Sequence, residues 1–284
     1  MTLSQPFAGY LTQARELALL AIGFFALALL VKGMRAVTDS RDAAKETKNN
    51  IALFVLETLA VAPYVGLAVG WVHGQVHGTG EVFVGAPLWT AIGPVGSFVC
   101  ALFLCDFVAY VSHRLYHTKW LWPVHAVHHS DTHLTWFSLL RQHPFERLRA
   151  LVDLSVMILL GLPDLAILSV AMVRTYWGYL IHADLPWTLG PLSWLLVSPA
   201  MHRWHHALEA RGAGVNFGIV FSVFDRMFGT YHVPGLHTGE TGVAEVIAPG
   251  IVGQYLHPFR AWTGSVRRGS GETELQQQRR RPIG

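Results

Sequence analysis

HRLYHTKWLWPVHAVHHSDTH, residues 113–133, places six histidines in 21 positions. The later stretch MHRWHH, residues 201–206, repeats part of the same pattern. In an α-helix, side chains that are three or four positions apart lie on one face. The histidines follow that spacing in three sets: His113 and His117; His125, His128 and His129; His202, His205 and His206. Each set is therefore expected to present its imidazoles together on one helix face.

These three sets predict a site for at least two metal ions. Neutral imidazole is a common ligand of zinc, copper, iron and nickel. Eight imidazoles exceed the roughly four to six ligands that one such ion accepts. Pro123 and Pro199 each precede a triplet, and Ser198 stands at an N-cap position. We therefore expect each triplet to lie in the first turn of a helix.

The composition is typical of a membrane protein. Of the 284 residues, 52% are hydrophobic and only 14% are charged, with a mean hydropathy of +0.36. Soluble domains usually carry about a quarter charged residues. The net charge of +3 does not indicate nucleic acid as a partner, because the basic residues lie beside apolar segments, where they orient the chain in a bilayer.

Apolar segments predict the membrane architecture. Residues 16–31, 51–72 and 91–112 are expected to form spans, and Pro63 interrupts the second of them. Residues 148–182 are apolar but are broken by GLPD. The part before that break would be only about 17 Å long as a helix, too short for a hydrocarbon core of about 30 Å, so we expect a helical hairpin.

The predicted fold is therefore an all-α integral membrane protein with about four transmembrane or hairpin helices. A cytosolic helical cap carries the histidine-rich dimetal site. We expect residues 1–263 to form one membrane-integrated domain. Residues 264–284 are polar and are expected to be a disordered tail.

The distribution of charge predicts the orientation. Residues 32–48 are rich in Lys and Arg, whereas the expected loop 73–90 has neither. Basic loops stay on the cytosolic side. The histidine sets are therefore expected on the cytosolic face of a multi-pass protein of a bacterial inner membrane or the endoplasmic reticulum. His73 and His77 are also four apart, but in a glycine-rich segment on the other side, and are not expected to bind metal.

Several other polar residues stand in apolar surroundings. Asp106 and Tyr110 form one helical stripe with His113, so the Asp106 carboxylate is expected to accept the second N–H of a ligating histidine. Arg174 and Glu57 are expected to have structural roles, paired within the bundle or reaching toward the membrane surface. Tyr176, Trp177 and Tyr179 are candidates for the lining of a substrate pocket, and aromatic packing at an interface explains them equally well.

The segments HRLYH, HAVHH and HRWHH resemble the three histidine boxes of the fatty acid hydroxylase/sterol desaturase superfamily. Their flanks are similar too, as in DFVAYVSHRLYH, HHSDTHLTWFSLLRQHPFE, HADLPW and VNFGIVFSVFDRMFGTYH. The similarity covers about residues 98–235, which it implies to be the catalytic core. The pattern is closest to the bacterial sterol-desaturase-like and alkylglycerol-monooxygenase-like branches.

The resemblance implies an oxidoreductase with two iron ions held by histidines alone, which uses O₂ to hydroxylate or desaturate a lipid. It adds His182 as a ninth ligand, and it implies hydrogen-bonding roles for Asn216 and Asp225. Where many relatives have a further histidine, this chain has Gly178, so a tenth ligand is absent or comes from elsewhere. No flavin or nicotinamide motif is present, so electrons must come from an external donor such as a ferredoxin, a b-type cytochrome or a reduced pterin.

Two other functions fit the residues alone. Imidazoles do not discriminate between iron and zinc, so a dizinc membrane hydrolase is possible, and zinc could occupy the site in purified protein. A metal-ion transporter is the second alternative, but transporter sites usually lie near the bilayer midplane. The predicted histidine sets instead follow the spans.

Overall fold

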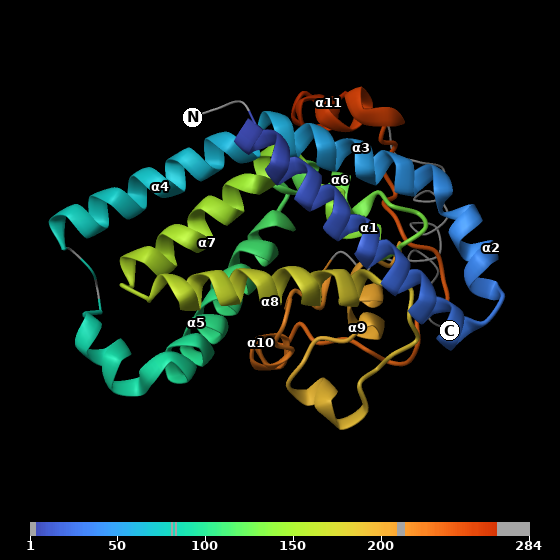
Figure 1. Ribbon diagram of the computed structural model, residues 1–284. Helices are drawn as coiled ribbons and strands as arrows, with labels where there is room; N and C mark the ends of the chain where they lie inside the picture. The colour runs from blue at the N-terminus through green and yellow to red at the C-terminus, as the bar shows by residue number, and fades with distance from the viewer. Residues whose placement is uncertain (1–3, 81, 83, 209–213, 266–284) are drawn as a thin grey trace.

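The computed structural model describes residues 4–80, 82, 84–208 and 214–265. The described chain is helical, with two isolated β-bridges (Figure 1). The helices are α1 (Ser4–Lys32), α2 (Arg35–Asp42), α3 (Ala44–Ala60), α4 (Ala62–Thr79), α5 (Ala86–Tyr116), α6 (Trp122–His129), α7 (Leu148–Leu159), α8 (Asp164–His182), α9 (Pro199–His205), α10 (Val223–Met227) and α11 (Gly250–Trp262). Three short 3₁₀ helices are η1 (Trp136–Leu140), η2 (Pro144–Arg147) and η3 (Gly190–Trp194).

The predicted all-α membrane class is confirmed. Two helical segments, Leu11–Lys32 of α1 and the whole of α5, are long and apolar enough to cross a bilayer. The α3–α4 pair bends by 46° and counts as a third if it is one broken span. Pro63 lies in the first turn of α4. N–H groups in a first turn have no intrahelical acceptor, so the lack of one in proline costs no hydrogen bond there. The predicted interruption of this span is therefore present.

Two predicted loops are shorter than expected. Segment 32–48, predicted as a basic loop, contains α2 and the start of α3. Helix α4 continues to Thr79, so the expected loop 73–90 is reduced to residues 80–85. Glycine costs about 1 kcal/mol in a helix in water, but a backbone beside lipid must satisfy its own hydrogen bonds. The glycine-rich segment therefore remains helical.

The predicted helical hairpin is formed by α7 and α8. They meet at a turn that contains Gly161, whose φ is +67°. A Cβ atom on that residue would lie 2.6 Å from the carbonyl oxygen of Val84, so the turn requires glycine. From this turn α7 packs on α4 and α8 packs on α5, and the two helices diverge like a V (Figure 1).

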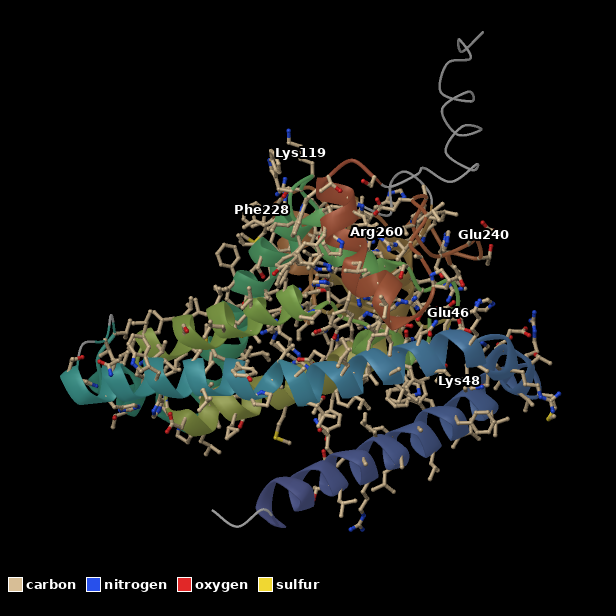
Figure 2. The ribbon with its side chains drawn as sticks, turned by 90° about the horizontal axis from the view of Figure 1, so that it is seen from above. Glu46, Lys48, Lys119, Phe228, Glu240 and Arg260 are labelled. Atoms are coloured by element: carbon tan, nitrogen blue, oxygen red, sulfur yellow. The ribbon has the colours of Figure 1, made fainter. Side chains whose placement is uncertain are left out.

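The cap is built from short helices beyond α5. Figure 2 shows Lys119, Phe228 and Arg260 on the side of the α3–α4 layer away from α1. Ser198 caps α9 as predicted, because its side chain accepts the N–H of Met201 at 3.1 Å.

The expected position in a first helical turn is wrong in part for both histidine triplets, since His205 ends α9 and His206 is its C-cap residue. Helix α6 ends at His129, so His128 and His129 occupy its last turn. Beyond it, the Asp131 carboxylate accepts hydrogen bonds from Asn50 and Ser138. These bonds direct the chain away from a helical path. Of the predicted tail 264–284, all but the first two residues lie outside the described part of the chain.

Candidate metal centre

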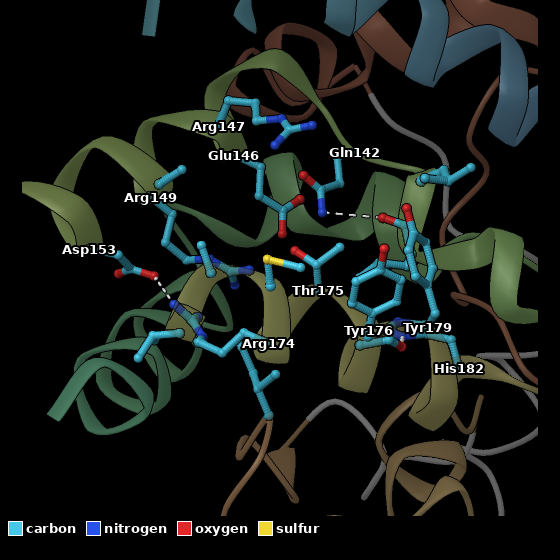
Figure 3. A pocket seen from close by; sticks show the side chains of 18 of the residues that line it. Gln142, Glu146, Arg147, Arg149, Asp153, Arg174, Thr175, Tyr176, Tyr179 and His182 are labelled. Carbon is cyan, nitrogen blue, oxygen red and sulfur yellow. Dashed lines mark hydrogen bonds and ion pairs between the residues drawn. The ribbon is translucent and has the colours of Figure 1, made fainter. Parts of the chain in front are cut away.

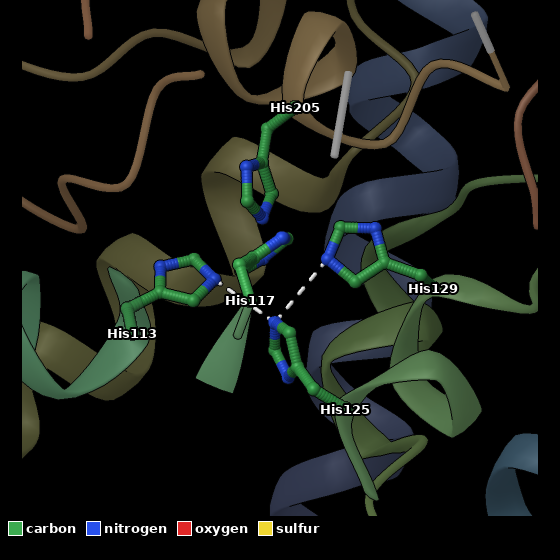
Figure 4. A group of neighbouring side chains, drawn as sticks. All are labelled: His113, His117, His125, His129 and His205. Carbon is green, nitrogen blue, oxygen red and sulfur yellow. Dashed lines mark hydrogen bonds between the residues drawn. The ribbon is translucent and has the colours of Figure 1, made fainter. Parts of the chain in front are cut away.

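The structure gathers the nine predicted histidines into two neighbouring groups. Within each group, one possible ligand atom per residue lies within 4.8 Å of the others. Eight of the nine side chains are buried, and His117 is half-buried. The first group (Figure 4) is His113, His117, His125, His129 and His205; the second is His128, His182, His202 and His206.

Each HxxHH triplet contributes to both groups. His125 and His129, one turn apart on α6, join the first group, and His128 joins the second. The second triplet has the reverse assignment: His202 and His206 are in the second group and His205 is in the first. The two groups are adjacent, since the rings of His129 and His206 stack with centroids 4.3 Å apart. Each HxxHH triplet thus supplies ligands to both groups from one short helix.

Hydrogen bonds at Nδ1 fix the tautomers of the first group. His113 donates from Nδ1 to the carbonyl oxygen of Phe217 at 2.8 Å. His125 donates from Nδ1 to the carboxylate of Glu146, also at 2.8 Å. With the proton assigned to Nδ1 by these acceptors, each Nε2 carries a lone pair. The two Nε2 atoms nevertheless lie 3.0 Å apart.

The second group repeats this arrangement. His128 donates from Nδ1 to the carbonyl oxygen of Arg141 at 3.1 Å, and His182 donates to that of Gly178 at 2.7 Å. Their Nε2 atoms are 3.2 Å apart. The Nε2 atom of His202 lies 3.0 Å from that of His182. The Nε2 lone pairs of His128 and His182 therefore point at one another, as those of His113 and His125 do.

Such pairs are unfavourable as neutral imidazoles and favourable around a cation. Metal–nitrogen bonds of about 2.0–2.1 Å at roughly right angles separate two nitrogens by about 3 Å. In addition, the buried Nε2 of His205 has no hydrogen-bond partner among the described residues. The nitrogen donors present therefore fit two metal ions.

The electrostatic environment keeps these ligands neutral. Burial lowers the pKa of His205 to about 4, although its hydrogen bond to Val215 opposes the shift. Burial and the neighbouring imidazoles hold the pKa values of His129 and His206 well below their ordinary range. At pH 7 these side chains are therefore unprotonated and available as ligands.

The loop around residues 215–221 orients the histidines. The carbonyl oxygen of Val215 accepts the Nδ1 proton of His205 at 2.8 Å, as that of Phe217 does for His113. Asn216, with a φ of +59°, donates to the carbonyl oxygens of Met201 and His232. Its side chain thereby holds the loop against α9.

Asp225 fastens the same loop from the other side. Its carboxylate accepts the N–H groups of Phe217 and Gly218 at 2.7 and 2.8 Å. It also accepts the hydroxyl proton of Thr230, to which Tyr110 is hydrogen-bonded in turn. The loop that orients His113 and His205 is thus held in place by Asn216, Asp225 and Tyr110.

The structure changes the interpretation of Asp106. Its carboxylate does not accept a histidine N–H, since the Nδ1 proton of His113 goes to the Phe217 carbonyl. It accepts instead the backbone N–H groups of Val220 and Phe221, at 2.8–3.2 Å. Among the described residues these two amides have no other acceptor, so the buried Asp106 anchors the loop to α5.

Replacing Asp225 with alanine is expected to lower the free energy of unfolding by about 3 kcal/mol or more. Two buried amides would lose their acceptor, at about 1–3 kcal/mol each. Thermal unfolding of the detergent-solubilised protein measures this, with the exposed Glu240→Ala as control. Equal melting temperatures for the two variants would contradict the role of Asp225.

Glu146 is a functional residue that the sequence reasoning did not single out. It is buried, and among the described residues its carboxylate accepts a side-chain hydrogen bond from His125 alone. A carboxylate behind a ligating imidazole fixes the ring and increases its basicity. The available signal was its place at the end of LRQHPFE, the segment in which the carbonyl oxygen of Arg141 accepts the Nδ1 proton of His128.

A pocket of about 600 Å³ lies between α1, α7 and α8 and reaches both groups. Its walls include Leu20, Ala150, Met157 and Val170. Figure 3 shows Glu146, Tyr176, Tyr179 and His182 around it. The histidines that line its inner end are His113, His125, His128, His182 and His202.

The pocket confirms some sequence expectations and changes others. Tyr176 and Tyr179 line it, whereas Trp177 is not among its lining residues and donates from its indole N–H to the carbonyl oxygen of Val197. Arg174 and Glu57 form ion pairs within the bundle, one of the two structural roles expected for them. Arg174 pairs with Asp153 at 3.0 Å, and Glu57 pairs with an arginine of η2.

No tenth ligand joins the groups among the described residues. At Gly178, the position that the resemblance pointed to, a Cβ atom would lie only 3.0 Å from the Leu139 side chain. The space is therefore filled by an apolar side chain.

The fold and site define an all-helical membrane protein with a buried, histidine-only site suited to two metals. Residues 98–230 match the fatty acid hydroxylase family. The resemblance predicted from the histidine boxes is therefore confirmed over this part of the chain.

The chain is similar to several curated proteins over this region. It is 30% identical over 164 residues to ornithine lipid hydroxylase OlsE of Rhizobium tropici, covering 57% of this chain and 50% of that protein. It is 28% identical over 161 residues to alkylglycerol monooxygenase of Homo sapiens, covering 56% and 36%. The corresponding Caenorhabditis elegans protein is 28% identical over 140 residues, covering 48% and 27%. The chain thus spans half or less of these relatives, and no solved structure matches it.

Proposed function

We propose that the protein is a membrane-bound, non-haem di-iron oxidoreductase that uses O₂ to hydroxylate or desaturate a lipid. The observation that carries the proposal is the facing of Nε2 lone pairs in two adjacent groups, because only cations make that arrangement favourable. The nine histidines are the proposed ligands, with Asp106, Tyr110, Asn216, Asp225 and Glu146 holding them in place.

The assignment of iron rests on the family and not on the ligand set. Imidazole binds zinc as readily, so a dizinc hydrolase is the alternative that the test must exclude. Two iron ions held by these histidines would supply the activation of O₂ that oxidation of an unactivated C–H bond requires. The names of two of the relatives, ornithine lipid hydroxylase and alkylglycerol monooxygenase, support lipid chemistry.

The chain's own contribution is positioning and exclusion of water. The pocket between α7, α8 and α1 has mainly apolar walls and ends at the histidines. A lipid chain could lie between the arms of the V while one carbon reaches the centre. Glu146 would hold the His125 ring in its metal-facing orientation throughout.

We also propose the arrangement in the cell. The basic segment 32–48 supports an orientation in which the histidines lie on the cytosolic side. An external donor, a ferredoxin, a b-type cytochrome or a reduced pterin, would deliver electrons there. Residues 1–263 would act as one domain, since α1 packs on η1 and α8 and lines the pocket.

The function is tested by lipid analysis of cells that express the protein. Cells with the wild type, grown under isotope-labelled O₂, should gain lipids that carry the label or an added double bond. Cells with His202→Ala should gain neither. Unlabelled, hydrolysed products that also form without O₂ would overturn the oxygenase assignment in favour of the hydrolase.

Replacing Ala150 with tryptophan is expected to reduce turnover of long-chain substrates by about 10–200-fold. Ala150 lines the pocket from α7, so the larger ring would occupy chain-binding space. Metal content should not change. The matched control is Val152→Trp, because Val152 is 53% exposed on the same helix and does not line the pocket. Equal activity of the two variants would place the substrate elsewhere.

A further inference from the structure

A third cluster of ligand-type side chains lies far from the histidine groups. His73 and His77 come from the end of α4, and Asp164 is the first residue of α8. These helix ends lie at the end of the molecule away from α6 and α9 (Figure 1). The structure changes the sequence expectation here, because the two histidines lie on a helix instead of in a loop and have a carboxylate beside them.

The geometry of the cluster is close to that of a metal site. The His73 Nε2 atom lies 3.1 Å from an Asp164 carboxylate oxygen. The rings of His73 and His77 have centroids 4.1 Å apart. One possible ligand atom from each of the three residues lies within 4.8 Å of the others. Ligands of one ion lie about 3–3.5 Å apart at bond lengths of about 2.0–2.2 Å, so small rotations of exposed side chains suffice.

The donor set indicates the class of ion. Two imidazole nitrogens and one carboxylate oxygen suit zinc and similar divalent transition metals, whereas calcium and magnesium prefer oxygen alone. The side chains of His73 and Asp164 are 39% and 69% exposed. Water can therefore complete the coordination.

We propose that His73, His77 and Asp164 bind a divalent transition metal ion such as Zn²⁺, separate from the di-iron centre. The site joins α4 to α8 directly after the hairpin turn, where Gly161 already packs against Val84. A bound ion would tether the tip of the V-shaped hairpin to α4. It thereby stabilises the two helices whose diverging arms form the walls of the pocket.

The test measures Zn²⁺ binding to the full-length, metal-loaded protein in detergent by equilibrium dialysis at pH 7. Wild type should bind one Zn²⁺ more than His77→Ala and Asp164→Asn, or bind it at least about 10-fold more tightly. Excess Zn²⁺ should raise the melting temperature of wild type and not that of the two variants. The control His133→Ala, an exposed histidine outside all three clusters, should behave as wild type.

Two results would overturn the proposal. Equal Zn²⁺ binding by wild type and His77→Ala would show that there is no site. Loss of binding in His77→Ala but not in Asp164→Asn would show an adventitious histidine pair on α4, with no tether to the hairpin. Because the histidine groups are intact in all these variants, neither result bears on the di-iron centre.

Discussion

His202→Ala is expected to lose about one of two metal ions per chain and to lose lipid oxidation by more than about 100-fold. His202 belongs to the smaller group, in which its Nε2 atom lies 3.0 Å from that of His182 and 3.1 Å from that of His206. Its removal leaves three imidazoles in that group. Even outer partners of metal ligands cost about 10–100-fold when they are removed, so loss of a ligand should cost more.

Metal analysis and activity must be measured on the same preparation. His133→Ala is the matched control, because it also removes an imidazole but from an exposed position. Full metal content and activity in His202→Ala would contradict the assignment of the second group. Loss of both metals would instead show that the two groups fold as one unit, through the α9 helix that they share.

Glu146→Ala is expected to reduce activity or metal affinity by about 10–100-fold, and Glu146→Gln by much less. The carboxylate accepts the Nδ1 proton of His125, and an amide oxygen at the same position could still accept it. Alanine would leave that buried N–H without an acceptor, which costs about 1–3 kcal/mol. The ring of His125 would then be free to turn its Nε2 away from the first group.

The comparison of these two variants shows whether Glu146 acts by orienting the His125 ring or through its negative charge. Each is assayed for bound metal, for turnover and for thermal unfolding. If glutamine is as damaging as alanine, the negative charge of Glu146 matters, and hydrogen bonding to His125 is not its main role. If neither variant changes metal binding or turnover, Glu146 is only a packing residue.

The spacing of the histidines predicted which side chains converge. It did not predict which histidine belongs to which of the two groups. The i, i+3, i+4 pattern placed His125, His128 and His129 on one helical arc, as the structure shows. His128 faces a different group from His125 and His129. This difference depends on the packing of α6 between α5 and α9. Such tertiary packing leaves no periodic signal in the sequence.

The polar residues around the site show the same limit. Asp106 stood out because a carboxylate within an apolar span is costly, but the sequence could not show which donors it meets. The backbone amides of Val220 and Phe221 reach it from more than a hundred residues away. Glu146 lay in a segment of ordinary polarity, and only the fold places it behind His125.

Local composition was a weaker guide to helix ends. The Lys/Arg-free, glycine-rich segment at 73–90 predicted a loop, and α4 instead runs through its first part. Glycine lowers helix propensity in water, but the need for internal hydrogen bonds in a bilayer is larger. The turn at Gly161 was found from sequence because proline and glycine coincide there.

The most direct test of the proposed di-iron centre is the metal content of the wild-type protein, purified in mild detergent from cells supplied with iron. Elemental analysis should give about two iron ions per chain. Two zinc ions that cannot be replaced by iron with recovery of O₂-dependent activity would contradict the oxygenase assignment. Less than one metal ion per chain, even after anaerobic reconstitution with ferrous iron, would contradict the metal centre itself.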